Sequence, residues 1–351
     1  MNKKACILAL ATASAIFASA AFFWLRDNKL PNFQKSAELF VLPEEDAAEV
    51  IEKIAVDNKV INRKSLERAF KAKEVAQYLK PGHYFITKSN SSVYVARMLN
   101  NGWQSPVRMT LTGNLRVKSN IAAKIACQLL IDSATVCNAL NDDHFLANFG
   151  VTPKTVFSIM MPDTYDMYWT ASANDILDKQ KAATDAFWTK DNLDKAAKFG
   201  LTRLEVSTLA SIVCSESNHE PEMPKIAGVY LNRLKLGMPL QADPTVAFCF
   251  DYKPERILKK HLEVESEYNT YKHTGLPPGP ICIPTRAALE AVLNPDFGGS
   301  WGKGNLYFCA NADFSGTHSF ARTLSEHNAN ANAFRNELDR RSKARKAAAR
   351  K

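Results

Sequence analysis

The sequence predicts an α+β protein with an N-terminal transmembrane helix, a small strand-and-helix subdomain and a larger mixed α/β region. Three observations lead to this prediction. An uncharged stretch opens the chain, strand-like and helix-like segments alternate over residues 39–104, and helical segments alternate with turn-rich, aromatic stretches in the remainder. With 351 residues the chain is long enough for two or three domains.

The first segment has the length and the flanking charges of a membrane anchor. Residues 5–25 carry no charge, and as a helix they would span roughly 31 Å, the thickness of a bilayer core. Lysines within residues 1–4 favour a cytoplasmic N-terminus, which places the rest of the chain outside the cytoplasm. The alternative is a cleaved signal peptide, because Ala18-Ser19-Ala20 resembles a cleavage site, although the apolar run continues past it. A polar linker is expected over residues 26–38.

Residues 39–104 are predicted to form a small β-α-α-β-α subdomain. FVLPEEDAAEVIEKIAVDNKV starts like a strand and continues as a helix, since Val50, Ile51 and Ile54 recur at helical spacing. RKSLERAFKAKEVAQYL predicts a second helix. KPGHYFIT predicts a turn at Pro81-Gly82 followed by a strand, and VYVARMLNNG predicts a third helix.

Residues 105–200 are predicted to connect this subdomain to the last third of the chain. SPVRMTLTG indicates a strand over residues 105–113, and helical segments follow over 118–148. SIMMPDTYDMYW predicts a strand, a turn at Pro162-Asp163 and a further extended stretch. Long helices are then expected over 171–199. Beyond them the chain is rich in proline, glycine and aromatic residues, a composition typical of loops that carry binding sites.

The charge distribution argues against nucleic acid as a partner. Of the net charge of +9, six units lie in the C-terminal run DRRSKARKAAARK, and the body of the protein is close to neutral. Such a basic tail, residues 338–351, is usually solvated or disordered, and less often contacts an anionic surface.

The cysteines permit disulfides without defining them. Six follow the apolar run, and an even number in an oxidising compartment allows fifteen pairings that the sequence does not rank. No CxxC motif or Cys/His cluster with zinc spacing is present, which argues against a metal site. Free buried cysteines are an equal alternative. The six are Cys127, Cys137, Cys214, Cys249, Cys282 and Cys309.

One helix concentrates reactive side chains in the stretch SIVCSESNHE. Thr202 and Glu205 fit a capping box, and Leu209, Ile212 and Val213 then form an apolar stripe. Glu216 continues this stripe near the helix end, whereas Cys214, Ser215 and Glu220 do not share it. Desolvation and the helix dipole should raise the pKa of Glu216, which suits a general acid. The alternative is a helix-end glutamate in a salt bridge or in solvent.

Other chemistries fit this stretch less well. His219-Glu220 would need a second histidine at position 223 to begin a zinc-protease motif, and Met223 stands there. His219 does not lie directly over Cys214 on a helix, so the thiol lacks an adjacent base. Ser215 has neither a nucleophile elbow nor an obvious lysine partner. The stretch therefore predicts a single carboxylate as the acid/base.

Several separated motifs resemble the MltG (YceG-like) endolytic murein transglycosylases in order and spacing. The resemblance covers residues 5–335, since the single N-terminal anchor matches as well, and its first motifs are KPGHYF and MPDTYDMYW. They continue with LASIVCSES, IAGVYLNRLKLGMPLQADPTV, YNTYKHTGLPPGPI, LYFCA and HSF. The resemblance implies a YceG-like catalytic domain over residues 201–337 and a LysM-like, membrane-proximal subdomain over 39–104. It also implies an inner-membrane protein that faces the periplasm and works beside peptidoglycan synthases, with no metal or cofactor.

The resemblance further implies an activity. Family members cleave the β-1,4 bond between N-acetylmuramic acid and N-acetylglucosamine in peptidoglycan strands without water, leaving 1,6-anhydro-muramoyl ends. A single glutamate carries out both proton transfers, unlike the two carboxylates of most glycoside hydrolases. Glu216 matches that position. The family's Glu-Lys-Glu-Thr is here Cys214-Ser215-Glu216-Ser217, so one nearby acid is absent. The alternatives are an inactive glycan-binding scaffold and an ordinary glycoside hydrolase.

Further residues match positions that the resemblance implies to be in contact with substrate. Asp243 could equally be a turn residue before Pro244, and the two tyrosines could equally belong to the core. The predicted substrate-binding residues are Gln241, Asp243, Tyr268, Asn269, Tyr271, His318 and Asn328.

Overall fold

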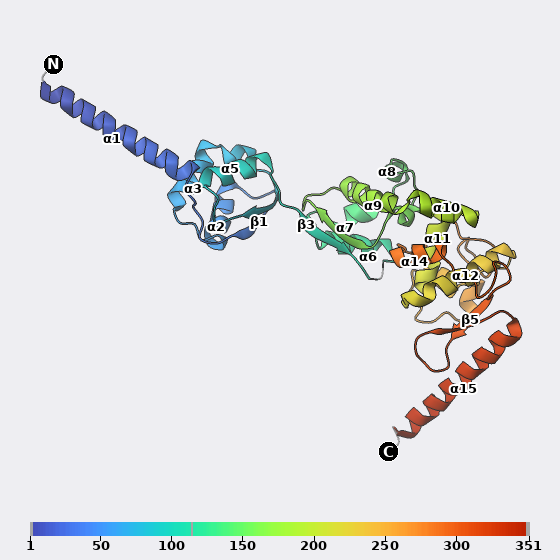
Figure 1. The fold of residues 1–351 in the computed structure, drawn as a ribbon. Coiled ribbons are helices and arrows are strands. Elements are labelled where there is room, and N and C mark those ends of the chain that lie inside the picture. The colour runs from blue at the N-terminus through green and yellow to red at the C-terminus, as the bar shows by residue number, and fades with distance from the viewer. Residues whose placement is uncertain (1–2, 114, 349–351) are drawn as a thin grey trace. The chain divides into compact units, whose positions relative to one another are not determined.

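The computed structural model describes residues 3–113 and 115–348, which form two compact units (Figure 1). The first unit comprises the residues up to Met109 together with segments 128–130 and 166–171. The second comprises the other segments from Thr110 onward. Residues 1–2 of the predicted cytoplasmic N-terminus and residues 349–351 of the predicted basic tail lie outside the described residues.

The chain begins with helix α1 (Lys3–Asn28), which contains the helix predicted for residues 5–25. Within the described residues, no helix meets the combined length and apolarity required of a membrane span. The last turn of α1 packs onto helix α3 (Arg63–Ala72). There the carboxylate of Asp27 accepts hydrogen bonds from Arg68 at 2.7 and 2.9 Å and from Ser65 at 2.5 Å.

The remainder of the first unit is confirmed as β-α-α-β-α with one added helical turn. Strands β1 (Ala37–Val41) and β2 (Gly82–Ile86) pair antiparallel, with Ala37 opposite Ile86 and Val41 opposite Gly82. Helix α2 packs on β1, α3 packs on α2 and α5, and these helices share one buried cluster with the two strands; the short α4 is the addition. The helices not yet given bounds are α2 (Ala47–Asp57), α4 (Val75–Tyr78) and α5 (Ser92–Asn101).

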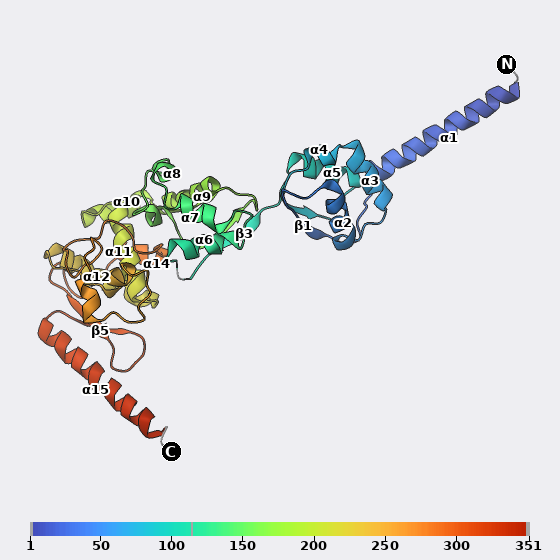
Figure 2. The same cartoon turned by 180° about the vertical axis from the view of Figure 1, so that it is seen from behind.

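The middle of the chain largely follows the predicted elements. Strand β3 (Val107–Leu111) pairs with β4 (Asp163–Met167), and α6 and α7 lie side by side (Figure 2). The helices are α6 (Lys118–Ala126), α7 (Ser133–Ala139), α8 (Asp143–Ala147), α9 (Ala173–Phe187) and α10 (Lys190–Lys198).

The strand predicted before Pro162 is wrong. The 3₁₀ helix η1 (Val156–Ile159) includes the first half of that segment, residues 158–159. Met160 and Met161 are buried, as an apolar strand would be. However, the backbone N–H of Met161 donates to the side-chain oxygen of Gln180 at 3.0 Å. A buried glutamine therefore satisfies this N–H group, a partner that local hydrophobic pattern does not reveal.

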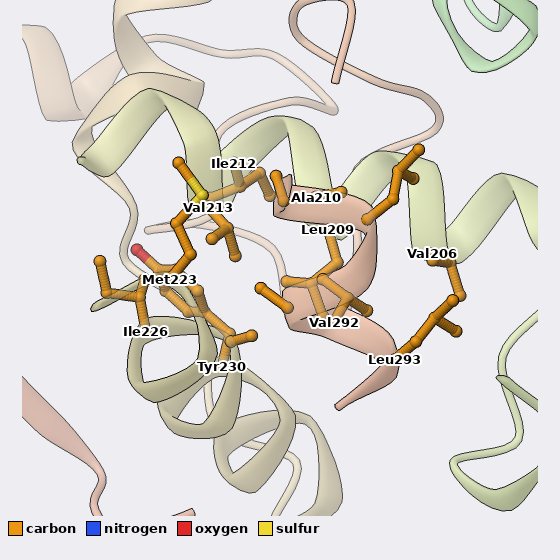
Figure 3. Packing of buried hydrophobic residues seen from close by; sticks show 14 of the residues in the cluster. Val206, Leu209, Ala210, Ile212, Val213, Met223, Ile226, Tyr230, Val292 and Leu293 are labelled. Atoms are coloured by element: carbon orange, nitrogen blue, oxygen red, sulfur yellow. The ribbon is translucent and has the colours of Figure 1, made fainter. Parts of the chain in front are cut away.

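The core of the second unit surrounds helix α11 (Arg203–Glu216), which packs against α12 (Met223–Lys235) and α14 (Arg286–Leu293). Figure 3 shows side chains of these helices converging. The predicted apolar stripe is too narrow, because every residue from Val206 to Val213 is buried. The small side chains on the other faces of α11 allow neighbouring elements, including α13 (Asp243–Phe248), to cover it.

The C-terminal part adds a hairpin and a long helix. Strands β5 (Tyr307–Ala310) and β6 (His318–Ala321) pair antiparallel. Helix α15 (Leu324–Ala348) follows, and the basic run predicted to be solvated or disordered continues this helix as far as Ala348. The short 3₁₀ helices η2 (Glu220–Glu222) and η3 (Lys259–Glu263) lie in the preceding connections.

Candidate active site

Local sequence signals define both ends of α11. The predicted capping box is present: Glu205 accepts from the backbone N–H of Thr202 at 2.8 Å, and its own N–H donates to Thr202 Oγ1 at 3.2 Å. The helix ends because Ser217 adopts an extended conformation, four residues before Pro221. Glu216 is therefore the last helical residue, at the C-terminal end of the central core helix.

Glu216 is half-buried, so its carboxyl group can be reached from solvent, and the protein atoms packed around that group still desolvate it. Tyr230, on α12, donates its hydroxyl proton to Glu216 Oε1 at 2.6 Å. Burial raises the pKa of Glu216 to about 7, the Tyr230 hydrogen bond opposes this rise, and the negative charge of Asp243 adds to it. The predicted direction of the pKa shift is confirmed. A nearby charge on another element, Asp243, accompanies desolvation as a cause.

Asp243 forms a second hydrogen-bonded pair beside Glu216. It begins α13 and is exposed, and its Oδ1 accepts the hydroxyl proton of Tyr271 at 2.6 Å. Burial, together with the negative charges of Asp243 and Glu216, raises the pKa of Tyr271. Tyr230 and Tyr271 thus remain neutral, and each donates its hydroxyl proton to one carboxylate. Glu216, Tyr230, Asp243 and Tyr271 are called the carboxylate cluster below.

Gln241 lies just before Asp243 in a left-handed conformation, with φ of 52°. Its backbone N–H donates to the carbonyl of Thr270 at 3.1 Å, and its side-chain oxygen accepts from Arg233 at 3.4 Å. Arg233 also donates to the carbonyls of Leu306 at 2.7 Å and Leu240 at 2.8 Å. This buried guanidinium therefore fixes the loop that carries Gln241 and Asp243.

Two of the predicted substrate-binding residues instead stabilise the fold. The ring of Tyr268 is buried against Phe248, with ring centroids 4.6 Å apart. Asn269 is fully buried, and its amide donates to the carbonyls of Leu262 and Val264 at 2.8 and 2.9 Å. Tyr268 is therefore better interpreted as a core residue, which was the alternative to substrate binding. The amide of Asn269 is committed to holding the loop before Tyr271.

His318 lies on β6 and is held by a buried carboxylate. Glu222 accepts from the backbone N–H of His318 at 2.8 Å, and its other oxygen lies 3.1 Å from His318 Nδ1. Phe308 contacts the rings of both His318 and Tyr230, at centroid distances of 5.3 and 5.9 Å. A continuous set of contacts thus connects His318 to the carboxylate cluster. Asn328 is exposed on α15.

Comparison with known proteins decides the family. The YceG-like family profile matches residues 40–333, most of the chain. This chain belongs to the YceG-like family. A solved yceG-like protein from Listeria monocytogenes shares 26% identity and a TM-score of 0.56, over 84% of this chain and 99% of that one.

Two curated relatives of this YceG-like chain carry the same name. An endolytic murein transglycosylase from Bacillus subtilis (strain 168) is 29% identical over 303 residues, which is 82% of each protein. An endolytic murein transglycosylase from Streptococcus pneumoniae serotype 2 is 26% identical over 282 residues. That match covers 72% of this chain and half of the pneumococcal protein.

Three residues of this YceG-like site were not singled out from the sequence. Tyr230 and Arg233 lie within the motif IAGVYLNRLKLGMPLQADPTV, where their apolar and basic neighbours suggest an ordinary amphipathic helix. Glu222 lies next to Pro221 in a short turn. Tyr230 and Arg233 could have been found from the sequence. A buried helix that contains a phenol and a guanidinium needs polar partners for both groups, which points to a polar site beside it.

A cavity of about 480 Å³ lies beside the end of α11 in this YceG-like protein. Its lining includes Arg116, Cys214, Ser215 and Cys282, and does not include Glu216. In the part of the chain that the structure describes, no three His, Cys, Asp or Glu side chains gather closely enough to hold a metal ion.

Proposed function

We propose that this protein is an endolytic murein transglycosylase that cleaves the β-1,4 bond between N-acetylmuramic acid and N-acetylglucosamine within peptidoglycan strands. The observation that carries the proposal is the carboxyl group of Glu216, whose pKa of about 7 keeps a large fraction protonated at neutral pH. The names of the relatives from Bacillus subtilis and Streptococcus pneumoniae support the same activity.

In the proposed reaction Glu216 performs both proton transfers. Protonated Glu216 first donates its proton to the glycosidic oxygen, and the bond to C1 of the muramic acid residue breaks. The resulting carboxylate then accepts the proton of the C6 hydroxyl group as that oxygen attacks C1. This closes a 1,6-anhydro ring and restores protonated Glu216. A pKa near neutrality suits both steps, since neither protonation state is strongly disfavoured.

Other members of the carboxylate cluster have supporting roles in this proposal. Tyr230 orients the carboxyl group of Glu216 through its 2.6 Å hydrogen bond. Exposed Asp243 is placed to stabilise positive charge that develops at C1 in the transition state. We assign substrate contacts to the accessible groups of this cluster and its surroundings, namely Gln241, Asp243, Tyr271 and His318, and also to Asn328, which is exposed on α15.

We also propose a location and a setting for this activity. The uncharged run over residues 5–25 supports an inner-membrane anchor, with the catalytic part in the periplasm. The unit that contains β1 and β2 would be the LysM-like subdomain, close to the membrane. Cleavage of nascent strands there would end their elongation beside the peptidoglycan synthases. No metal or cofactor is required in this scheme.

A glycoside hydrolase is the second candidate, and one observation favours it. The charge of Asp243 acts on Glu216, so two carboxyl groups lie within electrostatic range of each other. A hydrolase uses such a pair, with one group as the acid and the other as base or nucleophile. Against this, the Asp243 carboxylate already accepts a 2.6 Å hydrogen bond from Tyr271, and the relatives are named transglycosylases.

The products of the reaction distinguish the candidates. The full chain, purified in detergent, is incubated with peptidoglycan strands, and the new chain ends are identified by mass spectrometry. We expect 1,6-anhydro-muramoyl ends from internal cuts. Reducing ends would establish a hydrolase, and intact strands would indicate an inactive glycan-binding scaffold.

The pH dependence of activity should shift in opposite directions in two variants. Activity should fall as the pH rises through about 7, because Glu216 then loses the proton that it donates. Tyr230→Phe removes a hydrogen bond that lowers the Glu216 pKa, so the fall should move to higher pH. Asp243→Asn removes a negative charge that raises this pKa, so the fall should move to lower pH.

The measurement is the pH profile of kcat/KM for each variant on the same strands. Tyr271→Phe is a suitable comparison, because it leaves the charge of Asp243 in place and removes only its hydrogen bond. Shifts of Tyr230→Phe and Asp243→Asn in the same direction would contradict Glu216 as the titrating group.

A further inference from the structure

Two cysteines that are far apart in the sequence bring their thiols together at the C-terminal end of α11. Cys214 lies in the last turn of α11, and Cys282 lies in the proline-rich loop before α14. Their sulfur atoms are 3.5 Å apart, although 68 positions separate the two residues. Both thiols are free.

The backbone around both thiols is held in place. Ser211, one turn before Cys214, accepts from the Cys282 thiol through its carbonyl at 3.3 Å. Its hydroxyl oxygen accepts from the backbone N–H of Ile281 at 3.0 Å. On the other side of Cys282, the N–H of Ile283 donates to the carbonyl of Leu115 at 3.0 Å. The packing of the loop on α11 therefore brings the two thiols into contact.

We propose that Cys214 and Cys282 form an intramolecular disulfide when the protein meets a disulfide oxidant. A disulfide bond is about 2.05 Å long, so the sulfur atoms need to approach by only about 1.5 Å. Rotation of two side chains can provide this movement. The link would tie the end of the helix that carries Glu216, two residues beyond Cys214, to the loop that covers it.

The surroundings of the two thiols give them different roles in the thiol–disulfide exchange that forms the bond. Cys214 is partly accessible and lines the 480 Å³ cavity, whereas Cys282 is 4% exposed. The hydrogen bond between the two thiols lowers the pKa of Cys214, and Arg116 adds to this effect. The same bond, together with burial, raises the pKa of Cys282. Cys214 is therefore the attacking thiolate, and Cys282 is the resolving thiol.

The reaction is a pair of thiol–disulfide exchanges. The Cys214 thiolate attacks one sulfur of a small disulfide RS–SR, whose S–S bond breaks and releases one thiolate RS⁻. Cys282 then loses its proton to solvent and attacks the Cys214 sulfur, which releases the second RS⁻. The protein loses two electrons and two protons in total, and the oxidant gains both electrons and becomes two RSH molecules.

The bond should stabilise the folded protein, because it closes a long loop in the unfolded chain. This inference goes beyond the proposed function, since neither thiol titration nor melting temperature depends on transglycosylase activity. It also gives a role to Cys214, which stands where the resemblance implies a glutamate.

The test uses the full chain in detergent, equilibrated in buffers of reduced and oxidised glutathione. Remaining thiols are alkylated, and the protein is digested without reduction for mass spectrometry. We expect both thiols to be lost together and one cross-linked peptide to join Cys214 to Cys282. The melting temperature should rise by about 5 °C or more on oxidation and return when dithiothreitol is added.

Matched variants separate this pair from the other cysteines. Cys214→Ser and Cys282→Ala should each abolish the cross-link and the rise in melting temperature. A variant with Cys127→Ser and Cys137→Ser should retain both. Cys282→Ala carries a risk of misfolding because Cys282 is buried, so Cys214→Ser is the decisive variant. The proposal is overturned if both thiols stay reactive, if glutathione remains attached to Cys214, or if another pair is linked.

Discussion

Replacing Glu216 by glutamine should reduce strand cleavage by roughly 10²–10⁴-fold, the usual contribution of a positioned general acid or base. The amide has the shape of the protonated carboxyl group, and its oxygen can still accept the hydrogen bond from Tyr230. It cannot donate a proton to the glycosidic oxygen or accept one from the C6 hydroxyl group. The rate of formation of anhydro-muramoyl ends below pH 7 measures the loss.

The stability of the Glu216→Gln variant shows whether activity is lost through removal of the proton donor or through unfolding. Burial raises the Glu216 pKa from 4.5 to about 7 in the folded protein. Between these pH values the unfolded chain loses this proton before the folded chain does, so folding stability declines with rising pH. Glutamine has no such charge to bury. The variant should therefore melt no lower than the unchanged protein above pH 7.

A second glutamate in the same stretch provides the control. Glu220 is exposed beyond the end of α11, so Glu220→Gln should retain full activity. If Glu216→Gln folded normally and cut strands at the original rate, Glu216 would not be the acid/base.

Replacing Gly228 by alanine should destabilise the protein by about 3 kcal/mol, at the upper end of the usual cost of overpacking a core. Gly228 lies inside α12, where helix propensity alone would make alanine stabilising by about 1 kcal/mol. However, a methyl group there would overlap with the carbonyl oxygen of Asp296. The N–H of Asp296 also donates to the carbonyl of Pro224 at 2.9 Å, which holds this segment against α12.

Thermal denaturation measures this effect, and we expect a melting temperature lower by roughly 6–12 °C. Activity should fall as well, because a displaced α12 moves Tyr230 away from Glu216. Lys225→Ala, at an exposed position of the same helix, should change stability by no more than about 0.5 kcal/mol. If the Gly228→Ala protein were more stable, the segment around Asp296 would have moved to accommodate the methyl group, and it would not determine the position of α12.

Much of the element order could be predicted because the signals are local. The β-α-α-β-α order of the first unit depends on apolar periodicity and on turn residues a few positions away. The strand predicted before Pro162 failed because Gln180, 19 residues away, provides the hydrogen-bond partner of Met161. The apolar stripe of α11 was too narrow for a similar reason, since burial of its other faces depends on elements distant in the sequence.

By itself, the sequence determined where α11 begins, that Glu216 lies on its apolar face near its C-terminal end, and that the pKa of Glu216 is raised. These features depend on Thr202, Glu205 and the phase of one helix, all within a few turns. Only the tertiary structure decided which groups surround that carboxyl group. Tyr230 reaches Glu216 across 14 positions, Tyr271 reaches Asp243 across 28, and Cys214 meets Cys282 across 68. Helical periodicity relates residues three or four apart, so contacts between different elements are set by how those elements pack.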